Sequence, residues 1–397
     1  MLRSSVSISL CLLLTSAFSE EPPKVLHFSV RNQVSAAREL TTIFQVLDLP
    51  EGEFTLRDAK GKAMASAYDR AARTLVFQDR FEKGQTRTYA VEPGAAEAVP
   101  LPPWNISTQT ASTGSDACVA ENGLLRVGIP IGGQGGLAML QIQALKGDYV
   151  LQVCPNGVAT GCIDDAKYAP QVEALVRAHG QGKADHPQVF DLNFGPPQKV
   201  EVLEPNPFQR EIRMTCRPSA TKGNGEKADV VGESTVSLLL EWGSPVLRIR
   251  SMREVTKTFY NHNGFDLNHI GIAAYPVQVQ LDRSGKAVPL NADEGGAPRS
   301  IGFKKFLWLK QGAGETAVYQ PDFEALGIDG ARMIASPNWL CTVVSQSWLQ
   351  GWRPVKIPAR RYEDRLVLVC DLGSLPGKKS PEEWLVDLET PLQSKKP

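Results

Sequence analysis

The sequence predicts an all-β protein, in which a small N-terminal β-sandwich is followed by a large antiparallel β-supersandwich. Three observations lead to this fold class. Short runs rich in β-branched and aliphatic residues recur along the chain, and Gly, Pro, Asn and Asp turn signals separate them. A helical pattern is confined to two brief segments, 166–178 and 322–326. The 397 residues, of which 42% are hydrophobic, are enough for about two domains, each with its own core.

Residues 1–19 are expected to form a secretory signal peptide. A basic start at Arg3 precedes the apolar run Val6–Leu14, and the small residues Ala17 and Ser19 follow it. We therefore expect cleavage after Ser19 and a secreted or periplasmic location. The apolar run is too short to cross a membrane, and no later apolar run reaches membrane length, so no membrane span is predicted.

The mature chain is expected to divide into four parts. Residues 20–92 form the small β-sandwich, because short candidate strands alternate with turn signals of the Pro-Glu-Gly and Lys-Gly kind. Residues 93–115, rich in Pro, Ala, Ser and Thr, form a linker. Residues 116–390 form the large supersandwich, and residues 391–397 form a tail.

A long hairpin is the clearest element of the large domain. Two strand-like runs, 233–242 and 246–255, flank the turn Gly243-Ser244-Pro245. On the return run, side-chain alternation places Arg248, Arg250 and Met252 on one face, and Leu247, Ile249, Ser251 and Arg253 on the other. The Gly-rich run 132–136 is interpreted as a second hairpin turn, because a phosphate-binding loop needs a helix directly after it.

Six cysteines remain after the signal peptide: Cys118, Cys154, Cys162, Cys216, Cys341 and Cys370. An even number in an exported chain favours disulfides, and Cys154–Cys162 is the expected pair. The C-x-x-C spacing does not occur, so no metal site is predicted. No cofactor is predicted either, because the chain has no nucleotide-binding, serine hydrolase or zincin motif.

Positively and negatively charged side chains are equally numerous, which argues against some classes of binding partner. Lys and Arg together number 43, as do Asp and Glu, so the formal net charge is zero. This argues against general attraction to nucleic acid or to an anionic membrane.

The stretch 259–269 is predicted to be a polar loop that carries chemistry. It contains the acid/base and amide residues Tyr260, His262, Asn263 and His269. Histidine and tyrosine can transfer protons near neutral pH, and amides can stabilise developing negative charge. A polar surface loop without catalytic function is the alternative interpretation.

Arginines and tryptophans supply candidate binding residues. Arg250 and Arg253 could bind a carboxylate or sulfate, provided that the hairpin pairs with the strand carrying Arg210, Arg213 and Arg217; a solvated face balanced by Glu residues is the alternative. Trp348 and Trp352, followed by Arg353, are candidates for a rim that stacks on sugar rings.

Two segments resemble parts of bacterial carbohydrate-active proteins. The segment Ala120–Ile129, followed by the Gly-rich turn and Leu137, looks like the first strand of galactose-mutarotase-like supersandwich domains. The segment 49–93 is similar to the small β domain of exo-acting rhamnogalacturonan-lyase-like proteins. Unlike many such lyases, the chain shows no α/α toroid.

The resemblance implies an exported polysaccharide lyase that cleaves an acidic, uronate-containing polysaccharide or oligosaccharide by β-elimination. This chemistry needs a neutraliser for the uronate carboxylate, a base and an acid. Our candidates are Arg250 or Arg253 with Asn263 as neutralisers, His262 or His269 as base, and Tyr260 as acid. A non-catalytic glycan-binding or envelope protein, and a sugar mutarotase or epimerase, are the alternative hypotheses.

Overall fold

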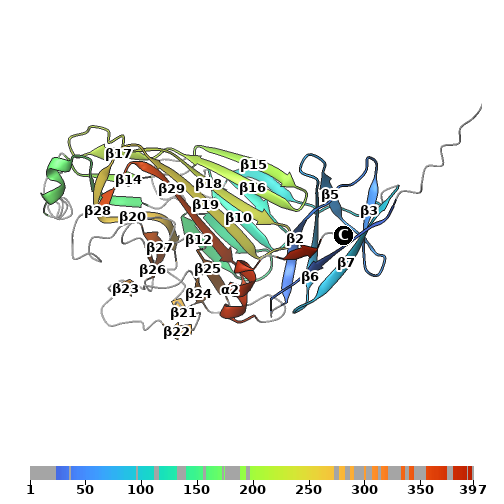
Figure 1. Ribbon diagram of the computed structural model, residues 1–397. Coiled ribbons are helices and arrows are strands. Elements are labelled where there is room, and N and C mark those ends of the chain that lie inside the picture. Colours follow the sequence, from blue (N-terminus) through green and yellow to red (C-terminus); the bar gives the residue numbers. More distant parts are fainter. Residues whose placement is uncertain are drawn as a thin grey trace, which may run out of the picture.

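The computed structural model is nearly all β, as predicted, and is built from several antiparallel sheets (Figure 1). Within the described residues, no helix has the length and apolar character needed to cross a membrane. The signal peptide predicted for residues 1–19 lies outside the described residues. The described residues are 24–34, 37–94, 97–110, 116–131, 140–154, 158–171, 174, 188–193, 197–271, 277–281, 287–289, 299–300, 306–311, 314–320, 332–335, 339–343, 355–372, 379–390 and 392–395.

The N-terminal sandwich packs two antiparallel sheets face to face. One has the strand order β30 (Gln393–Lys395), β1 (Leu26–Arg31), β7 (Thr86–Pro93), β3 (Phe54–Asp58), β4 (Ala63–Met64). The other has the order β2 (Arg38–Val46), β6 (Thr74–Phe81), β5 (Ser66–Asp69). Their inward faces share an aromatic centre, in which the ring centroids of Phe28 and Phe77 each lie within 5.2 Å of Tyr89.

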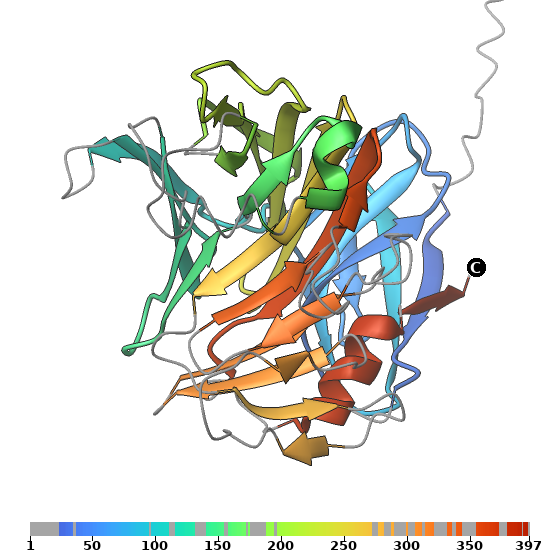
Figure 2. The same ribbon diagram turned by 90° about the vertical axis from the view of Figure 1, so that its left-hand side faces the viewer.

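The two segments expected to lack structure each contain a strand, which corrects the predicted linker and tail. In the expected linker 93–115, β8 (Asn105–Thr110) pairs with β9 (Asp116–Glu121) along its whole length. In the expected tail 391–397, β30 adds to the edge of the N-terminal sheet, with Ser394 opposite Val30. Figure 2 shows this last strand lying beside the N-terminal sandwich.

The large sandwich is formed by a thirteen-stranded and a nine-stranded sheet. The first contains β17 (Ser219–Lys222), β14 (Phe190–Asn193), β13 (Val158–Ile163), β20 (Phe259–Gly271), β12 (Val150–Cys154), β11 (Leu140–Ala144), β10 (Leu125–Pro130), β9 and β8, with β23 (Arg299–Ser300), β26 (Arg332–Ala335), β27 (Trp339–Val343) and β28 (Val355–Ile357) beside them. The second has the order β15 (Lys199–Asn206), β16 (Gln209–Cys216), β18 (Val231–Glu241), β19 (Val246–Val255), β29 (Arg360–Val369), β25 (Gly314–Tyr319), β24 (Phe306–Gln311), β21 (Val277–Leu281), β22 (Ala287–Pro289). Fully buried aliphatic side chains from both sheets, such as Val127, Ile142 and Leu238, fill the space between them.

The predicted hairpin is β18 and β19, and its face alternation is confirmed. Leu247 and Ile249 are buried in the core, whereas Arg248 and Arg250 are exposed. Gly243 has a φ of 64°, which its turn requires. The buried side chain of Asn122 fixes this turn, because its Nδ2 donates 2.8 Å hydrogen bonds to the carbonyls of Glu241 and Ser244.

The helical content is only partly as predicted. Within the segment predicted as a helix over 166–178, the described residues form a 3-10 helix, η1 (Ala166–Gln171), and Ala174 is α-helical; segment 322–326 lies outside the described residues. The helix α2 (Pro381–Glu389) was not predicted. Its Trp384 packs against Tyr319 of β25 and Val367 of β29, so α2 covers part of the outer face of the nine-stranded sheet.

The expected Cys154–Cys162 disulfide does not form, and Cys162 is a free buried thiol. Cys154 lies opposite His269 of β20, and Cys162 lies opposite Asn261 of the same strand. Eight residues along one strand span roughly 25 Å, whereas a disulfide needs Cα atoms within about 7 Å. Cys118 and Cys370 are free buried thiols as well.

Candidate functional site

A row of polar side chains crosses the outer face of the nine-stranded sheet. Arg213 on β16 lies opposite Ser237 on β18, Ser237 lies opposite Arg250 on β19, and Arg250 lies opposite Arg365 on β29. The arginine-bearing strands β16 and β19 are thus separated by β18 rather than paired directly. Neighbouring strands lie about 4.8 Å apart, so the four side chains can contact one extended ligand.

Two of these guanidinium groups share a single carboxylate. Arg250 donates from Nε and Nη2 to the two oxygens of Glu363 at 2.8 Å each, and Arg365 Nε donates to Glu363 Oε1 at 3.0 Å. The hydrogen bond from Arg250 lowers the pKa of Glu363, and the same bond raises the pKa of Arg250. Two positive charges and one negative charge leave these three groups with a net charge of +1.

Ser237, Arg250 and Arg365 of this row line an open groove of about 710 Å³. The side chains of Arg250 and Arg365 are 49% and 53% exposed, so both guanidinium groups reach solvent. The floor also carries Glu211, whose Oε1 accepts hydrogen bonds from Ser237 at 2.9 Å and from Arg213 at 3.0 Å.

One wall of this groove is formed where α2 lies over β25 and β29. Leu388 and Glu389 of the helix line the groove there. Tyr319 of β25 donates a 3.2 Å hydrogen bond to Glu389. This wall therefore offers hydroxyl and carboxylate groups beside the guanidinium row.

The stretch 259–269, expected to be a loop, is a strand, so that expectation was wrong. β20 pairs on one side with β13 and β12 and on the other with β28 and β27. The Tyr260 backbone lies opposite Ile163 and Lys356, and His269 lies opposite Cys154. The His262 and Asn263 backbones belong to the same strand.

The structure describes the side chain of Tyr260 but not those of residues 262–271. The grouping of the two histidines with Asn263 therefore stays a prediction. Trp348, Trp352 and Arg353 lie outside the described residues, so the sugar-stacking rim stays a prediction as well.

Arg253 does not lie in the groove with Arg250. It is on the opposite, inward face of β19 and only 1% exposed. Around it, the inward face of the sheet changes from aliphatic to polar, since Ser251 and Asp364 lie opposite each other and are both buried. Gln320 Nε2 donates to Asp364 Oδ1 within this buried polar band.

The sequence analysis missed Arg365, Glu363 and the α2 wall. Arg365 and Glu363 reach Arg250 only through the pairing of β29 with β19, between residues 113 positions apart. The sequence does contain a signal for helix α2, because Ser380 and Glu383 form a capping box with Pro381 between them.

The arrangement is suited to binding anionic groups. Planar guanidinium groups hold carboxylates and sulfates by paired hydrogen bonds, and half-exposed arginines with a net positive charge are accessible to them. Among the described side chains, no group of three or more His, Cys, Asp and Glu is placed to hold a metal ion.

Comparisons with known proteins find similar solved structures but no family. No protein-family model matches the chain, and no curated protein matches its sequence. One similar solved structure is an alpha-mannosidase from Enterococcus faecalis V583, with a TM-score of 0.49 and 11% identity; the match covers 94% of this chain and 46% of that one. Another is a protein in glycosyl hydrolase family 38 from Enterococcus faecalis, with a TM-score of 0.46 and 11% identity; it covers 94% of this chain and 47% of that one. The chain thus spans less than half the length of either structure.

Proposed function

We propose that the protein binds an acidic saccharide in the groove on the outer face of the nine-stranded sheet. The observation that carries this proposal is the pair of half-exposed guanidinium groups, Arg250 and Arg365, that both donate to Glu363 and also reach solvent in the groove. A uronate carboxylate or a sulfate brings the second negative charge and accepts hydrogen bonds from Arg250, which uses two of its five N–H donors on Glu363.

The groove also suits the neutral parts of a saccharide. Its volume of about 710 Å³ lies within the usual range of about 300–1,000 Å³ for small-ligand sites. Ser237, Glu211 and Glu389 supply donors and acceptors for sugar hydroxyls along the row. An exported protein, as residues 1–19 predict, would meet such glycans outside the cell.

Calorimetric titration with defined oligosaccharides tests this proposal. We expect binding of uronate or sulfated oligosaccharides, weaker binding at high salt, and little binding of neutral ones. Arg250→Ala should weaken binding at least about tenfold, since a hydrogen bond to a charged group contributes about 1.5–3 kcal/mol.

Arg217→Ala is the matched control for the calorimetric test. Arg217 is an exposed arginine directly after β16, paired with Glu233 at 3.9 Å, and it does not line the groove. Equal affinities of the Arg250→Ala variant and the wild type would refute the proposal, as would equal losses in the two variants.

A lyase acting on uronate glycans is the catalytic candidate that we carry forward. Its candidate acid and base residues, Tyr260, His262 and His269, lie on β20 of the thirteen-stranded sheet, so this reaction would take place at a site separate from the arginine groove. In the proposed step, a base removes the proton beside the uronate carboxylate. The electron pair of that C–H bond forms a carbon–carbon double bond, the bond to the 4-linked sugar oxygen breaks, and that oxygen takes up a proton.

Absorbance of the unsaturated product measures this reaction directly. We expect turnover with a uronate polysaccharide, and a loss of about 10²–10⁴-fold in His262→Ala or His269→Ala with an unchanged melting temperature. No absorbance change across pectic, alginate and glycosaminoglycan substrates would reject the lyase and leave the binding function standing.

A further inference from the structure

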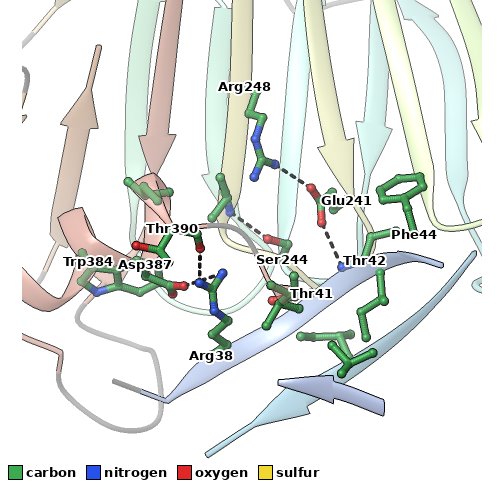
Figure 3. A pocket seen from close by; sticks show the side chains of 16 residues that line it. Arg38, Thr41, Thr42, Phe44, Glu241, Ser244, Arg248, Trp384, Asp387 and Thr390 are labelled. Atoms are coloured by element: carbon green, nitrogen blue, oxygen red, sulfur yellow. Dashed lines mark hydrogen bonds and ion pairs between the residues drawn. The ribbon is translucent and has the colours of Figure 1, made fainter. Parts of the chain in front are cut away.

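We propose that the cavity between the two sandwiches is a binding subsite for a neutral sugar unit of the same saccharide that the arginine groove holds. This inference rests on the proposed function and extends it from one unit of the ligand to the next. The cavity has a volume of about 430 Å³ and lies between β2 of the N-terminal sandwich, the end of the β18–β19 hairpin, and α2 (Figure 3).

The four charged groups that line the cavity form two ion pairs, and Asp387 also pairs with Lys379, which does not line it. On the β18–β19 side, Arg248 Nη1 donates a 2.6 Å hydrogen bond to Glu241 Oε1, while Glu241 Oε2 accepts from the Thr42 backbone N–H at 3.4 Å. On the α2 side, Arg38 Nη1 lies 2.9 Å from Asp387 Oδ1, and Arg38 Nη2 donates to the Thr390 carbonyl. Figure 3 shows these two networks on opposite sides of the cavity.

A charged ligand unit on the α2 side of the cavity would have to disrupt a buried ion pair. The side chains of Arg38 and Asp387 are only 7% and 11% exposed, so separating them would leave a desolvated charge without its partner. This side of the cavity thus selects against an acidic unit, whereas Arg248, whose side chain is 45% exposed, belongs to the side next to the groove.

The remaining lining suits an uncharged sugar. Thr41 donates its hydroxyl to the Glu39 carbonyl, so its oxygen can still accept a hydrogen bond from a ligand. Ser244 Oγ accepts from the Val246 N–H, so its own O–H can still donate to a ligand. Phe44 is half-exposed and lines the cavity, so its ring can pack against the apolar face of a sugar ring.

The cavity and the groove adjoin each other. Arg248 and Leu388 line both of them, and Arg248 precedes Arg250 by one side-chain position on the same face of β19. These two positions are about 7 Å apart along the strand. A ligand with its carboxylate at Arg250 can therefore continue past Arg248 and place its next unit in the cavity.

Calorimetry with two oligosaccharides of equal length tests the subsite. One is built only of uronate units, and the other carries a neutral unit at one end. Phe44→Ala should weaken binding of the mixed oligosaccharide about three- to tenfold and leave the all-uronate ligand unaffected, because an aromatic contact contributes about 0.5–1.5 kcal/mol. Val46→Ala is the matched control, since Val46 is another exposed apolar residue of β2 but does not line the cavity. Thr41→Phe, which fills the cavity, should act like Phe44→Ala.

The outcomes separate this inference from the proposed function. The subsite is refuted if Phe44→Ala and Thr41→Phe weaken the binding of both ligands equally, or if neither variant weakens the binding of the mixed ligand. The Arg250→Ala variant tests the groove independently of this result. A neutral disaccharide, followed by ligand-observed NMR, supplies an independent readout. It should bind the wild type and Arg250→Ala equally and lose its signal in Thr41→Phe. Absence of that signal in the wild type would also overturn the subsite.

Discussion

Replacing Glu363 with glutamine should strengthen the binding of an anionic ligand to the groove. The substitution keeps the shape of the side chain and an oxygen that accepts from Arg250, but removes the one negative charge that Arg250 and Arg365 share. The local net charge of the three groups therefore rises from +1 to +2.

The size of the effect follows from geometry. A ligand anion bound to the free edge of Arg250 would lie about 6 Å from the Glu363 carboxylate, because a guanidinium group and two hydrogen bonds separate them. Coulomb repulsion at this distance is about 0.7 kcal/mol in water and about 3 kcal/mol at an effective dielectric constant of 20. Since Arg250 is half-exposed, a gain of about 1 kcal/mol, or roughly fivefold in affinity, is expected.

A sulfated oligosaccharide is the best probe, because its charge persists in mild acid. Glu363 has a lowered pKa in the free protein through its bond to Arg250, and an anion that competes for Arg250 weakens that bond. Binding should therefore be accompanied by proton uptake, and wild-type affinity should rise as pH falls towards and below 4.5, the ordinary value for glutamate. Glu363→Gln should show no such rise.

Glu233→Gln is the matched control, because Glu233 is a carboxylate paired with an arginine outside the groove. Weaker binding in Glu363→Gln than in the wild type would refute the reasoning, as would a wild-type affinity for the sulfated probe that does not change with pH.

Three further predictions concern the stability and chemistry of the fold. Asp387→Asn should lower the free energy of unfolding by about 3–5 kcal/mol, because it removes the carboxylate that neutralises the buried Arg38 and Lys379; a loss below about 1 kcal/mol in chemical denaturation would contradict this. The Cys162 thiol has a pKa raised by burial and should react with a thiol reagent only after denaturation, so detection of a native disulfide at Cys162 by mass spectrometry would contradict the structure. Burial raises the pKa of Asp164, but hydrogen bonds from two lysines outweigh it and the net pKa is lowered. The charged Asp164 therefore stabilises the fold above the ordinary carboxylate pKa, and this contribution is lost as the pH falls through the pKa of Asp164 in the folded protein. In Asp164→Asn, the free energy of unfolding should therefore decrease less steeply with falling pH.

Local patterns predicted those elements whose side chains alternate cleanly. On β19, the succession of Leu247, Arg248, Ile249 and Arg250 gave the correct inward and outward faces. The same rule could not identify β20, whose Asn, Gly and Asp residues are uncommon in strands. Those residues are accommodated because partners on both sides satisfy the strand's backbone, and pairing of this kind is set by tertiary structure.

The candidate site was predictable only in part, for a similar reason. Arg250 was identified from its type and its face, but its partners Glu363 and Arg365 come from a strand more than a hundred positions later. No local pattern fixes the register between such distant strands. Arg253 was grouped with Arg250 by sequence proximity, although the odd spacing of the two residues already assigns them to opposite faces.

The C-terminal segment links the groove, the cavity and the N-terminal sandwich. β29 supplies Glu363 and Arg365, α2 supplies Leu388 and the Asp387 that holds Arg38, and β30 then pairs with β1. The three attachments use two kinds of interaction, namely strand pairing in the large and small sheets and a buried ion pair. Because Arg248 and Leu388 line both the groove and the cavity, the position of α2 sets the dimensions of both. The ion pair of Arg38 with Asp387 therefore holds the N-terminal sandwich in place and also fixes one wall of the region that we propose as a binding site.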